Sequence, residues 1–505
     1  MAAKEKCMEL VENISNSSGE ELLLYLKDLS ILINTSQGAS EMVLLIPCQL
    51  LFRCLKSSDD KQNFYCKSIL KKVLQFEKPD AVVLKYHDYV IEGMNHQYFE
   101  IRELCLSEVE RCSRSVNGVL ALVDNVDLLS YVARCVADEN LICAKMACKV
   151  LTNLSKHESG LAVLFQHQLQ SEFTELLQNK EVIRFRVFDI FIDIQKQSDE
   201  AFEACKLVGI FEKLLKELEG DDILVQMNCF ELLSSLASSS ERGLLYLEEH
   251  GVVVKLYNML LSAKEDPMME LAVPGIVKFF GHVAHLRPVE VTQKYPQFME
   301  QLYSQVSCGD PRLMPIAVET IGVIALTDAG LHAVFNSPVR NKHIMKVLFS
   351  HAMGSDSDLR LRAFETLSSI FFSQENFSEE LSSFSRGLYT AMTNKPLQAF
   401  VSVAKQPFES LRCSCLRLMK CLAKYEWVQQ DMVACPGYLE YLLDRKTEPE
   451  KSGRELKYDL IVELAHSPSA KQVFGMPYLL KLREYEREGP FFARAESAVA
   501  FEGAD

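Results

Sequence analysis

The sequence has 505 residues, of which 48% are apolar and 24% are charged, a balance typical of a folded globular protein. Its 54 basic and 69 acidic residues give a net charge of −15, which argues against a general nucleic-acid coat and against docking on anionic lipid, since both need a positive face. Gly and Pro number 21 and 16, so collagen-like chains and turn-rich all-β chains are disfavoured.

The N-terminal stretch and the cysteines bear on the cellular compartment. Residues 1–10 carry four charged side chains and no apolar run long enough for a signal peptide. Residues 42–55 are more apolar, but they include Pro47, Gln49 and Arg53 and are too short to span a bilayer. The 16 cysteines are therefore expected to be reduced thiols. The expected location is the cytoplasm, with the nucleus as a second candidate.

A repeat runs through the chain from about residue 147 to residue 422. Seven segments align on a central charged residue, and the positions two before, one before, two after and five after it are apolar in all seven. These four offsets share one face of an α-helix, so each segment is predicted to be a helix with a buried face that includes residues such as Phe191, Leu233, Phe280 and Leu367. The central residues, 40 to 52 positions apart, are Lys149, Asp189, Glu231, Lys278, Glu319, Glu365 and Arg417.

Further helical patterns precede these helices, for example at residues 200–206, 207–218, 241–249 and 252–261. A unit of two or three helices in about 40–47 residues is the armadillo/HEAT size class. One such unit cannot bury its apolar face alone, whereas stacked units can. We therefore expect an all-α fold, a right-handed α-solenoid of armadillo/HEAT-like repeats.

The predicted organisation has three parts. Residues 1–125 are expected to form degenerate N-terminal repeats or a cap, residues 126–488 the repeat array, and residues 489–505 a C-terminal tail. Within the array, the polar residues 446–455 are expected to form a loop, since they include Pro449 and Gly453.

Motifs of common enzymes are missing from the sequence. It has no Gly-Lys dipeptide and hence no phosphate-binding loop, and it has no Gly-x-Ser-x-Gly, His-Glu-x-x-His or Cys-x-x-Cys motif. Cys413 and Cys415 could in principle bind a metal, but Cys415 occupies an apolar core offset. His282 and His285 share a helix face, yet two ligands are too few for a zinc site. We expect no catalytic site, cofactor or metal.

The central residue of each repeat shares the outward helix face with the residue four positions later. In armadillo-type units this face lines the concave groove, so a row of charged side chains is expected there, although each of them alone could be an ordinary solvent-facing charge. Acids outnumber bases four to three at the centre, which favours a partner of mixed charge. The predicted partner-binding residues are Lys149, Asn153, Asp189, Asp193, Glu231, Ser235, Lys278, His282, Glu319, Glu365 and Arg417.

A nuclear-import adaptor is disfavoured as an alternative. Such armadillo proteins hold lysine-rich signals on a repeated Trp at the central position, with Asn four residues later. Here the central residues are charged, the sequence has one Trp, Trp427, and only Asn153 matches the Asn.

Several local stretches carry a resemblance to a known family, and it looks continuous from about residue 125 onward. They are residues 274–281, 295–298, 406–408, 436–445, 457–458, 474–475 and 488–492. In order and spacing they resemble the HEAT/armadillo-repeat family of 26S proteasome non-ATPase regulatory subunit 5, which are base-assembly chaperones.

The resemblance implies a C-shaped solenoid that holds the C-terminal domain of one proteasomal AAA-ATPase subunit while the regulatory-particle base assembles. The implied partners are proteasomal AAA-ATPase base subunits and the large non-ATPase scaffold subunit, and the chaperone is implied to be absent from the finished particle. We expect a monomer when free, with no nucleic-acid or membrane partner. The alternative is a stable HEAT-repeat scaffold or regulatory subunit of another multiprotein complex.

Overall fold

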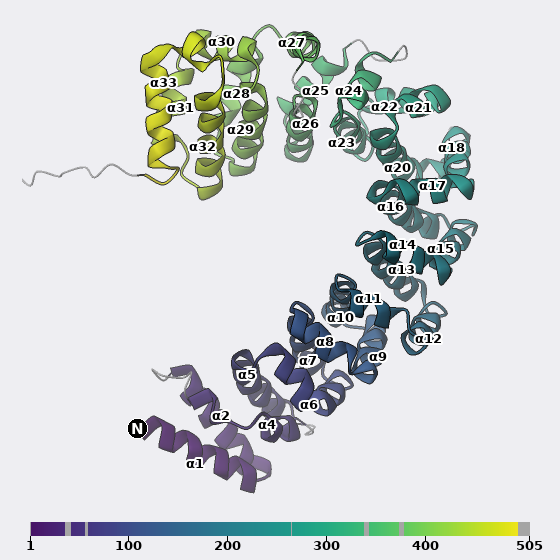
Figure 1. The fold of residues 1–505 in the computed structure, drawn as a ribbon, viewed down its shortest axis with the longest axis vertical. Helices are drawn as coiled ribbons and strands as arrows, with labels where there is room; N and C mark the ends of the chain where they lie inside the picture. Colours follow the sequence, from purple (N-terminus) through teal and green to yellow (C-terminus); the bar gives the residue numbers. More distant parts are fainter. Residues whose placement is uncertain are drawn as a thin grey trace, which may run out of the picture. The chain divides into compact units, whose positions relative to one another are not determined.

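A computed structural model describes residues 2–35, 42–55, 59–263, 265–337, 343–372 and 378–492 (Figure 1). Helices dominate these ranges, and none of their residues lies in a β-strand, which confirms the predicted all-α class. The chain divides into two compact units, unit 1 at residues 1–232 and unit 2 at residues 233–505. The division falls inside α16 (Ile223–Ser239).

Unit 1 is a stack of repeats of two or three short helices. The last helix of each repeat, here called its third helix, packs on the third helix of the next repeat, as α10 does on α7 and on α13. Its elements before α16 are α1 (Ala2–Asn16), α2 (Gly19–Thr35), α4 (Cys48–Cys54), α5 (Asp60–Phe76), α6 (Pro79–Met94), α7 (Phe99–Ser113), α8 (Val116–Val123), α9 (Val126–Arg134), the 3₁₀ helix η1 (Cys135–Ala137), α10 (Leu141–Leu154), α11 (Glu158–Leu164), α12 (His167–Leu176), α13 (Glu181–Gln195), α14 (Asp199–Leu207) and α15 (Ile210–Leu218).

Unit 2 repeats the arrangement, and its third helices α20, α23, α26, α29 and α32 pack one on the next (Figure 1). After α16 its elements are α17 (Glu241–Glu249), α18 (Val252–Ser262), α19 (Pro267–Glu270), α20 (Val273–Leu286), α21 (Pro288–Lys294), α22 (Pro296–Gln305), α23 (Met314–Ile324), α24 (Asp328–Phe335), α25 (Ile344–Ala352), α26 (Ser357–Ile370), α27 (Glu379–Met392), α28 (Pro396–Ala404), α29 (Glu409–Ala423), α30 (Glu426–Ala434), α31 (Tyr438–Leu443), the 3₁₀ helix η2 (Arg445–Thr447), α32 (Lys451–His466) and α33 (Ala470–Glu488).

The predicted buried face is confirmed on all seven predicted helices, which are α10, α13, α16, α20, α23, α26 and α29. Every one of their 28 apolar positions is buried except Cys148, which is half-buried. Leu233, Phe280 and Leu367 have no exposed surface, and Phe191 is 1% exposed. The solenoid of helical repeats is therefore held together by the face that the sequence pattern predicted.

Two more helices belong to the same series. In α7 the four offsets around Ser107 hold Cys105, Leu106, Val109 and Cys112, and all four are buried. Residues 1–125 are predicted to form degenerate repeats, and the centre of α7 is the uncharged Ser107, unlike the seven charged centres of the predicted repeat. In α32 the centre is Asp459, and the first core offset is a buried lysine, Lys457.

The prediction that residues 446–455 form a polar loop is wrong for much of that stretch, and Lys457, just beyond it on α32, is a buried lysine of the same region. It is 1% exposed, and its Nζ donates hydrogen bonds to the carbonyl oxygens of Tyr441 (2.6 Å) and Asp444 (2.7 Å) and to Thr447 Oγ1 (2.6 Å). Burial lowers the pKa of Lys457 to about 8, against the opposing charges of Glu448 and Asp444. Much of the predicted loop is helical instead, since α32 begins at Lys451.

Inside the stretch itself, the buried charged group is Glu448, which is 1% exposed. It accepts a hydrogen bond from Arg412 Nε on α29 at 3.1 Å. The polar composition of the stretch therefore reflects an internal network at Glu448 as well as exposed side chains such as Lys446, Lys451 and Glu455. The last helix, α33, ends at Glu488, and residues 493–505 of the predicted tail lie outside the described residues. The predicted division after residue 125 stays a prediction.

Successive repeats meet at a close approach that requires glycine. In four repeats, a glycine in the first turn of the first helix lies against a carbonyl oxygen at the end of the preceding third helix, where a Cβ would fall well inside van der Waals contact. That carbonyl belongs each time to the last core offset, five residues after the centre. The pairs of glycine and carbonyl residue are Gly118 with Cys112, Gly160 with Leu154, Gly243 with Leu236, and Gly330 with Ile324.

This contact predicts opposite effects for two Gly→Ala substitutions in unit 2. Gly330→Ala should lower the free energy of unfolding by roughly 1–3 kcal/mol, because the new methyl group strikes backbone. Gly387→Ala, inside α27 with open space around the position, should raise it by about 0.5–1 kcal/mol through helix propensity. Urea unfolding of both variants measures whether each substitution lowers or raises the free energy of unfolding. Equal effects of the same sign would contradict the junction.

Candidate partner-binding surface

Unit 1 exposes most of its share of the predicted row. Lys149 on α10, Asp189 and Asp193 on α13, and Glu231 on α16 are exposed, and Asn153 on α10 is half-buried. Each side chain lies on the helix face opposite the core offsets, because those offsets are turned inward to bury the apolar face. The prediction that this face is polar and accessible is confirmed for unit 1.

Three of these predicted residues meet in a shallow hollow between α7, α10 and α13, since Lys149, Asn153 and Asp193 all line it. Asn153 Nδ2 donates to Ser113 Oγ on α7 at 3.1 Å, and Lys156 Nζ donates to Asn153 Oδ1 at 2.9 Å. Hydrogen bonds from neighbouring residues therefore hold the Asn153 amide in a fixed orientation.

The sequence pattern missed other residues of the hollow. Glu110 and Arg114 on α7 also line it, and they form an ion pair at 2.6 Å. Because the register of α7 was unassigned, nothing placed them on the same face as α10. The four core offsets around Ser107 are the signal that could have found them.

Asp189 is the most electrostatically perturbed residue of the row. Although Asp189 is exposed, partial desolvation of its carboxyl group between neighbouring helices raises the pKa of Asp189, and the negative charges of Asp193 and Glu231 raise it further. Lys196 acts in the opposite direction, and its Nζ lies 2.9 Å from Asp193 Oδ1. The acidic part of the row is thus a cluster of carboxylates that repel one another, with Lys196 as a positive charge at one side.

In unit 2 the row is less uniform. Ser235, Lys278 and His282 are half-buried, while Glu319, Glu365 and Arg417 are exposed. Lys278 and His282 both have interactions within the protein. The predicted pattern of exposure therefore holds best at α23, α26 and α29.

Glu319 already has a partner inside the array. It pairs with Arg362 on the next third helix, and Arg362 Nε also lies 2.9 Å from Asp358 Oδ2. The sequence pattern missed Arg362, although its place three residues before Glu365 puts it on the same helix face. A similar cross-repeat pair joins Lys420 Nζ on α29 to Asp459 Oδ2 on α32 at 2.8 Å.

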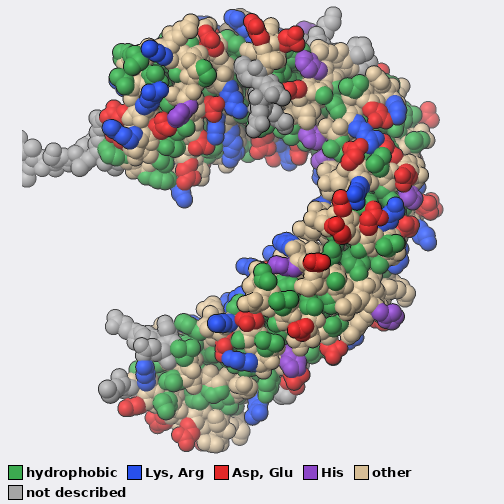
Figure 2. Space-filling model, in the orientation of Figure 1, with side chains coloured by type: hydrophobic (Ala, Val, Ile, Leu, Met, Phe, Trp, Pro, Cys, Tyr) green, Lys and Arg blue, Asp and Glu red, His purple; other side chains and the backbone are tan. Residues whose placement is uncertain are grey.

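Acidic and basic side chains are interspersed on the face of each unit that Figure 2 shows. In unit 1 the row is basic at α10, with Lys149, and acidic at α13 and α16, with Asp189, Asp193 and Glu231. In unit 2 acidic and basic side chains form pairs between neighbouring repeats, Glu319 with Arg362 and Lys420 with Asp459. A partner of mixed charge, and not a uniformly basic one, is the chemical match to this surface.

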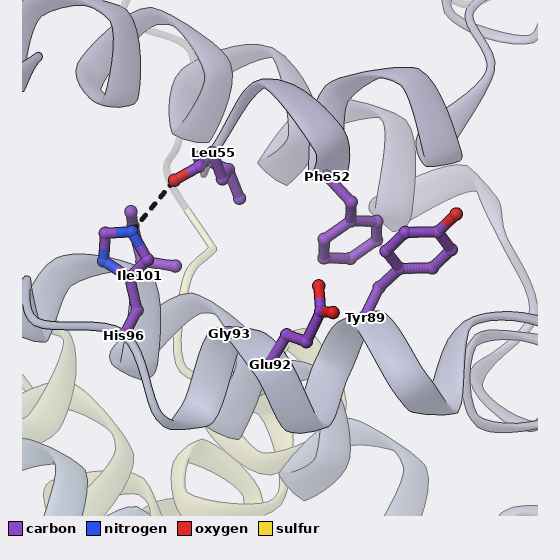
Figure 3. A pocket seen from close by; sticks show the side chains of 7 residues that line it. All are labelled: Phe52, Leu55, Tyr89, Glu92, Gly93, His96 and Ile101. Atoms are coloured by element: carbon purple, nitrogen blue, oxygen red, sulfur yellow. Dashed lines mark hydrogen bonds between the residues drawn. The ribbon is translucent and has the colours of Figure 1, made fainter. Parts of the chain in front are cut away.

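A small cavity of about 180 Å³ in unit 1 is a second place where a ligand could be sought (Figure 3). Its lining comes from α4, α6 and α7, and the rings of Phe52 and Tyr89 stack there with centroids 5.5 Å apart. His96 Nε2 lies 2.9 Å from the Leu55 carbonyl oxygen, so that ring is used in the local structure. The cavity is smaller than the roughly 300–1,000 Å³ of typical small-molecule sites, so the charged row is the better candidate.

The remaining sequence candidates for metal chemistry have structural contacts. Cys415 Sγ donates to the Phe400 carbonyl oxygen at 3.2 Å, and burial raises the pKa of the Cys415 thiol. His285 Nδ1 lies 2.9 Å from the Val323 carbonyl oxygen. Across the described ranges, no three or more His, Cys, Asp or Glu side chains gather as a metal site would need. Nor does any helix in those ranges have the length and apolar character that a bilayer crossing needs.

Stacked helical repeats with a charged outward row define an α-solenoid protein. The model of the protein family described as "Proteasome non-ATPase 26S subunit" matches residues 3–505. The chain belongs to this family, which confirms the resemblance found in the sequence.

Three relatives carry the name "26S proteasome non-ATPase regulatory subunit 5". The Bos taurus protein is 31% identical over 456 residues and the Homo sapiens protein 30% over 457, each alignment covering 90% of both chains. The Drosophila melanogaster protein is 25% identical over 338 residues, which cover 66% of this chain and 65% of that protein. An engineered protein of known structure matches 91% of this chain and 98% of its own at 15% identity, but its TM-score of 0.40 is too low to support an argument.

The carboxylate cluster predicts a pH-dependent gain in stability for Asp189→Asn. Because the folded-state pKa of Asp189 lies above its unfolded value of about 3.9, ionisation disfavours the folded state as pH rises through both values. The Asn variant should therefore be more stable than wild type at pH 7, and the gain should shrink as pH falls to 4. Urea unfolding at both pH values measures it.

Asp358→Asn is the control for this measurement. Asp358 pairs with Arg362, so its replacement removes an attraction and should give no gain. A gain for Asp189→Asn that is as large at pH 4 as at pH 7 would show that charge repulsion is not its cause.

Proposed function

We propose that this chain is an assembly chaperone for the base of the proteasome regulatory particle. Membership in the family of proteasome non-ATPase 26S subunits carries the proposal, and the relatives' names point to the same particle. The chaperone binds the C-terminal domain of a proteasomal AAA-ATPase subunit through its charged row. That ATPase, a neighbouring ATPase subunit and the large non-ATPase scaffold subunit share the intermediate, and the work is done in the cytoplasm or the nucleus.

The chemistry of the row suits a partner that must bind and then leave. Exposed charges at Lys149, Asp189 and Glu231 give a hydrated interface, unlike the apolar interfaces typical of permanent complexes. The chain acts by binding and not by catalysis, so release comes from competition with later subunits for the same partner surface.

Native size fractionation of cell extract tests the chaperone against a stable subunit of the same particle or of another complex. The chaperone should appear in small complexes that contain proteasomal ATPases and should be missing from assembled 26S particles. Stoichiometric presence in the 26S fractions would contradict it and favour a resident regulatory subunit. Presence only in complexes without ATPases would favour the alternative of a scaffold elsewhere.

The row predicts the outcome of a charge reversal in unit 1. Asp189→Lys combined with Glu231→Lys should weaken capture of the ATPase subunit at least tenfold, about 1.4 kcal/mol, because enclosed charged contacts are costly to lose. Both side chains are exposed in the free protein, so the fold should survive. Affinity capture with purified proteins, with circular dichroism as a check of folding, measures the effect.

A matched control carries the same change in net charge on another helix of the unit. Glu212→Lys with Glu219→Lys replaces two exposed acids on or next to α15. This control should bind like wild type. If the α13/α16 reversal also bound like wild type, the ATPase contact would have to lie off the row.

A further inference from the structure

Unit 1 carries a row of exposed apolar side chains beside the charged row. Ile142 on α10, Val182 on α13 and Leu224 on α16 stand seven residues before the central charged residue of their helices. Their side chains are 49%, 64% and 62% exposed. Three large apolar residues at one register of three successive helices form a continuous strip, here called the apolar strip, and not scattered surface residues.

The strip shares a helix face with the charged row, since seven residues are close to two full helical turns. Between the two rows on the same face lie the half-buried Met146, Phe185 and Met227. The surface of unit 1 is therefore apolar near the N-terminal ends of its third helices and charged near their middles.

The repeat itself does not require apolar residues at this register. In unit 2 the position seven before the centre varies: it holds Leu271 before α20, Arg312 before α23, Asp358 on α26 and Ser410 on α29. The core offsets are apolar in all of these helices, so packing is served equally well without the strip. Its presence at α10, α13 and α16 calls for a cause outside the fold of the repeat.

Contacts along the strip show that neighbouring helices are close. Asn228 Nδ2 on α16 donates to Glu181 Oε1 on α13 at 3.1 Å, immediately beside Val182 and four residues from Leu224. Arg186 on α13 reaches the carbonyl oxygen of Val136, just before α10, at 2.8 Å. Adjacent third helices pack about 8–10 Å apart, so the strip spans about 20 Å.

This spacing selects one kind of partner element. A helix advances about 10.5 Å in seven residues, so apolar side chains seven apart meet successive positions of the strip. An extended strand repeats on one face about every 6.6 Å and misses a step of 10 Å. On such a partner helix, the side chains beside its apolar residues would face Lys149 at one end and Asp189 and Glu231 at the other.

We propose that the apolar strip and the charged row of unit 1 together bind an amphipathic helix of a protein partner. That helix has apolar residues about seven apart over two to three heptads, an acidic side chain at the α10 end and basic side chains over α13 and α16. The inference deepens the proposed function, on which it rests for the partner's identity, by naming the element that this surface receives.

Two 22-residue peptides of the same composition test the geometry by fluorescence anisotropy against the full-length protein. One carries leucines at heptad spacing, with a glutamate at one end and lysines at the other, and the second carries its leucines at every other position. The heptad peptide should bind at least tenfold more tightly. In Val182→Ser/Leu224→Ser this preference should fall below threefold, while the control Val116→Ser/Leu207→Ser, whose residues are 62% and 84% exposed elsewhere in unit 1, should keep it.

The outcomes separate this inference from the proposed function. Heptad preference lost in the strip variant, with no ATPase captured by wild type, would uphold the helix site and overturn the chaperone role. Equal binding of the two peptides, or preference kept in the strip variant, would overturn the helix site whether or not ATPase is captured. Binding to phosphatidylserine vesicles, or self-association, that only the strip variant loses would identify a lipid surface or a second copy as the occupant and overturn it as well.

Discussion

The close approach between one repeat and the next sets the geometry on which the rest of each unit depends. At four junctions a glycine of the first helix, such as Gly160 or Gly330, lies on a carbonyl group near the end of the preceding third helix. A backbone contact of this kind has little freedom, because neither atom can rotate away as a side chain can. It fixes where one third helix ends relative to the next helix of the chain, and so it keeps equivalent residues of successive helices in register.

How much of this could be read from the sequence depended on whether a feature was periodic. The four core offsets predicted the third helix of each repeat, because burial requires apolar residues at the same positions in every repeat. Ser107 was missed because it is uncharged, unlike the seven predicted centres, and Lys457 broke the pattern because three oxygen acceptors satisfy its ammonium group inside the core. The junction glycines were missed because only some junctions carry one, so the glycine does not recur in every repeat as the core offsets do.

The candidate surface, too, was predictable from the sequence where its residues are periodic and unpredictable where they are not. Periodicity placed Lys149, Asp189 and Glu231 on one outward face, and the structure confirms that they are exposed. It did not reveal that Glu319 pairs with Arg362, since a long side chain crosses to the next repeat and its partner depends on three-dimensional spacing. Nor did it single out the apolar strip, because an apolar residue near a helix end is not unusual until its equivalents are seen at the same register on neighbouring helices.

Unit 1 therefore keeps two features on one face that the isolated chain would be more stable without. Water contacts the apolar side chains of Ile142, Val182 and Leu224, and the carboxylates around Asp189 repel one another. A repeat fold tolerates both, because its packing depends on a different helix face. A basic amphipathic helix would cover the first feature and neutralise the second, so part of the attraction comes from relieving costs already present in the free protein. The same costs return when the helix leaves, which makes a competitor that sequesters the helix, and not a weakening of the solenoid, the natural means of release.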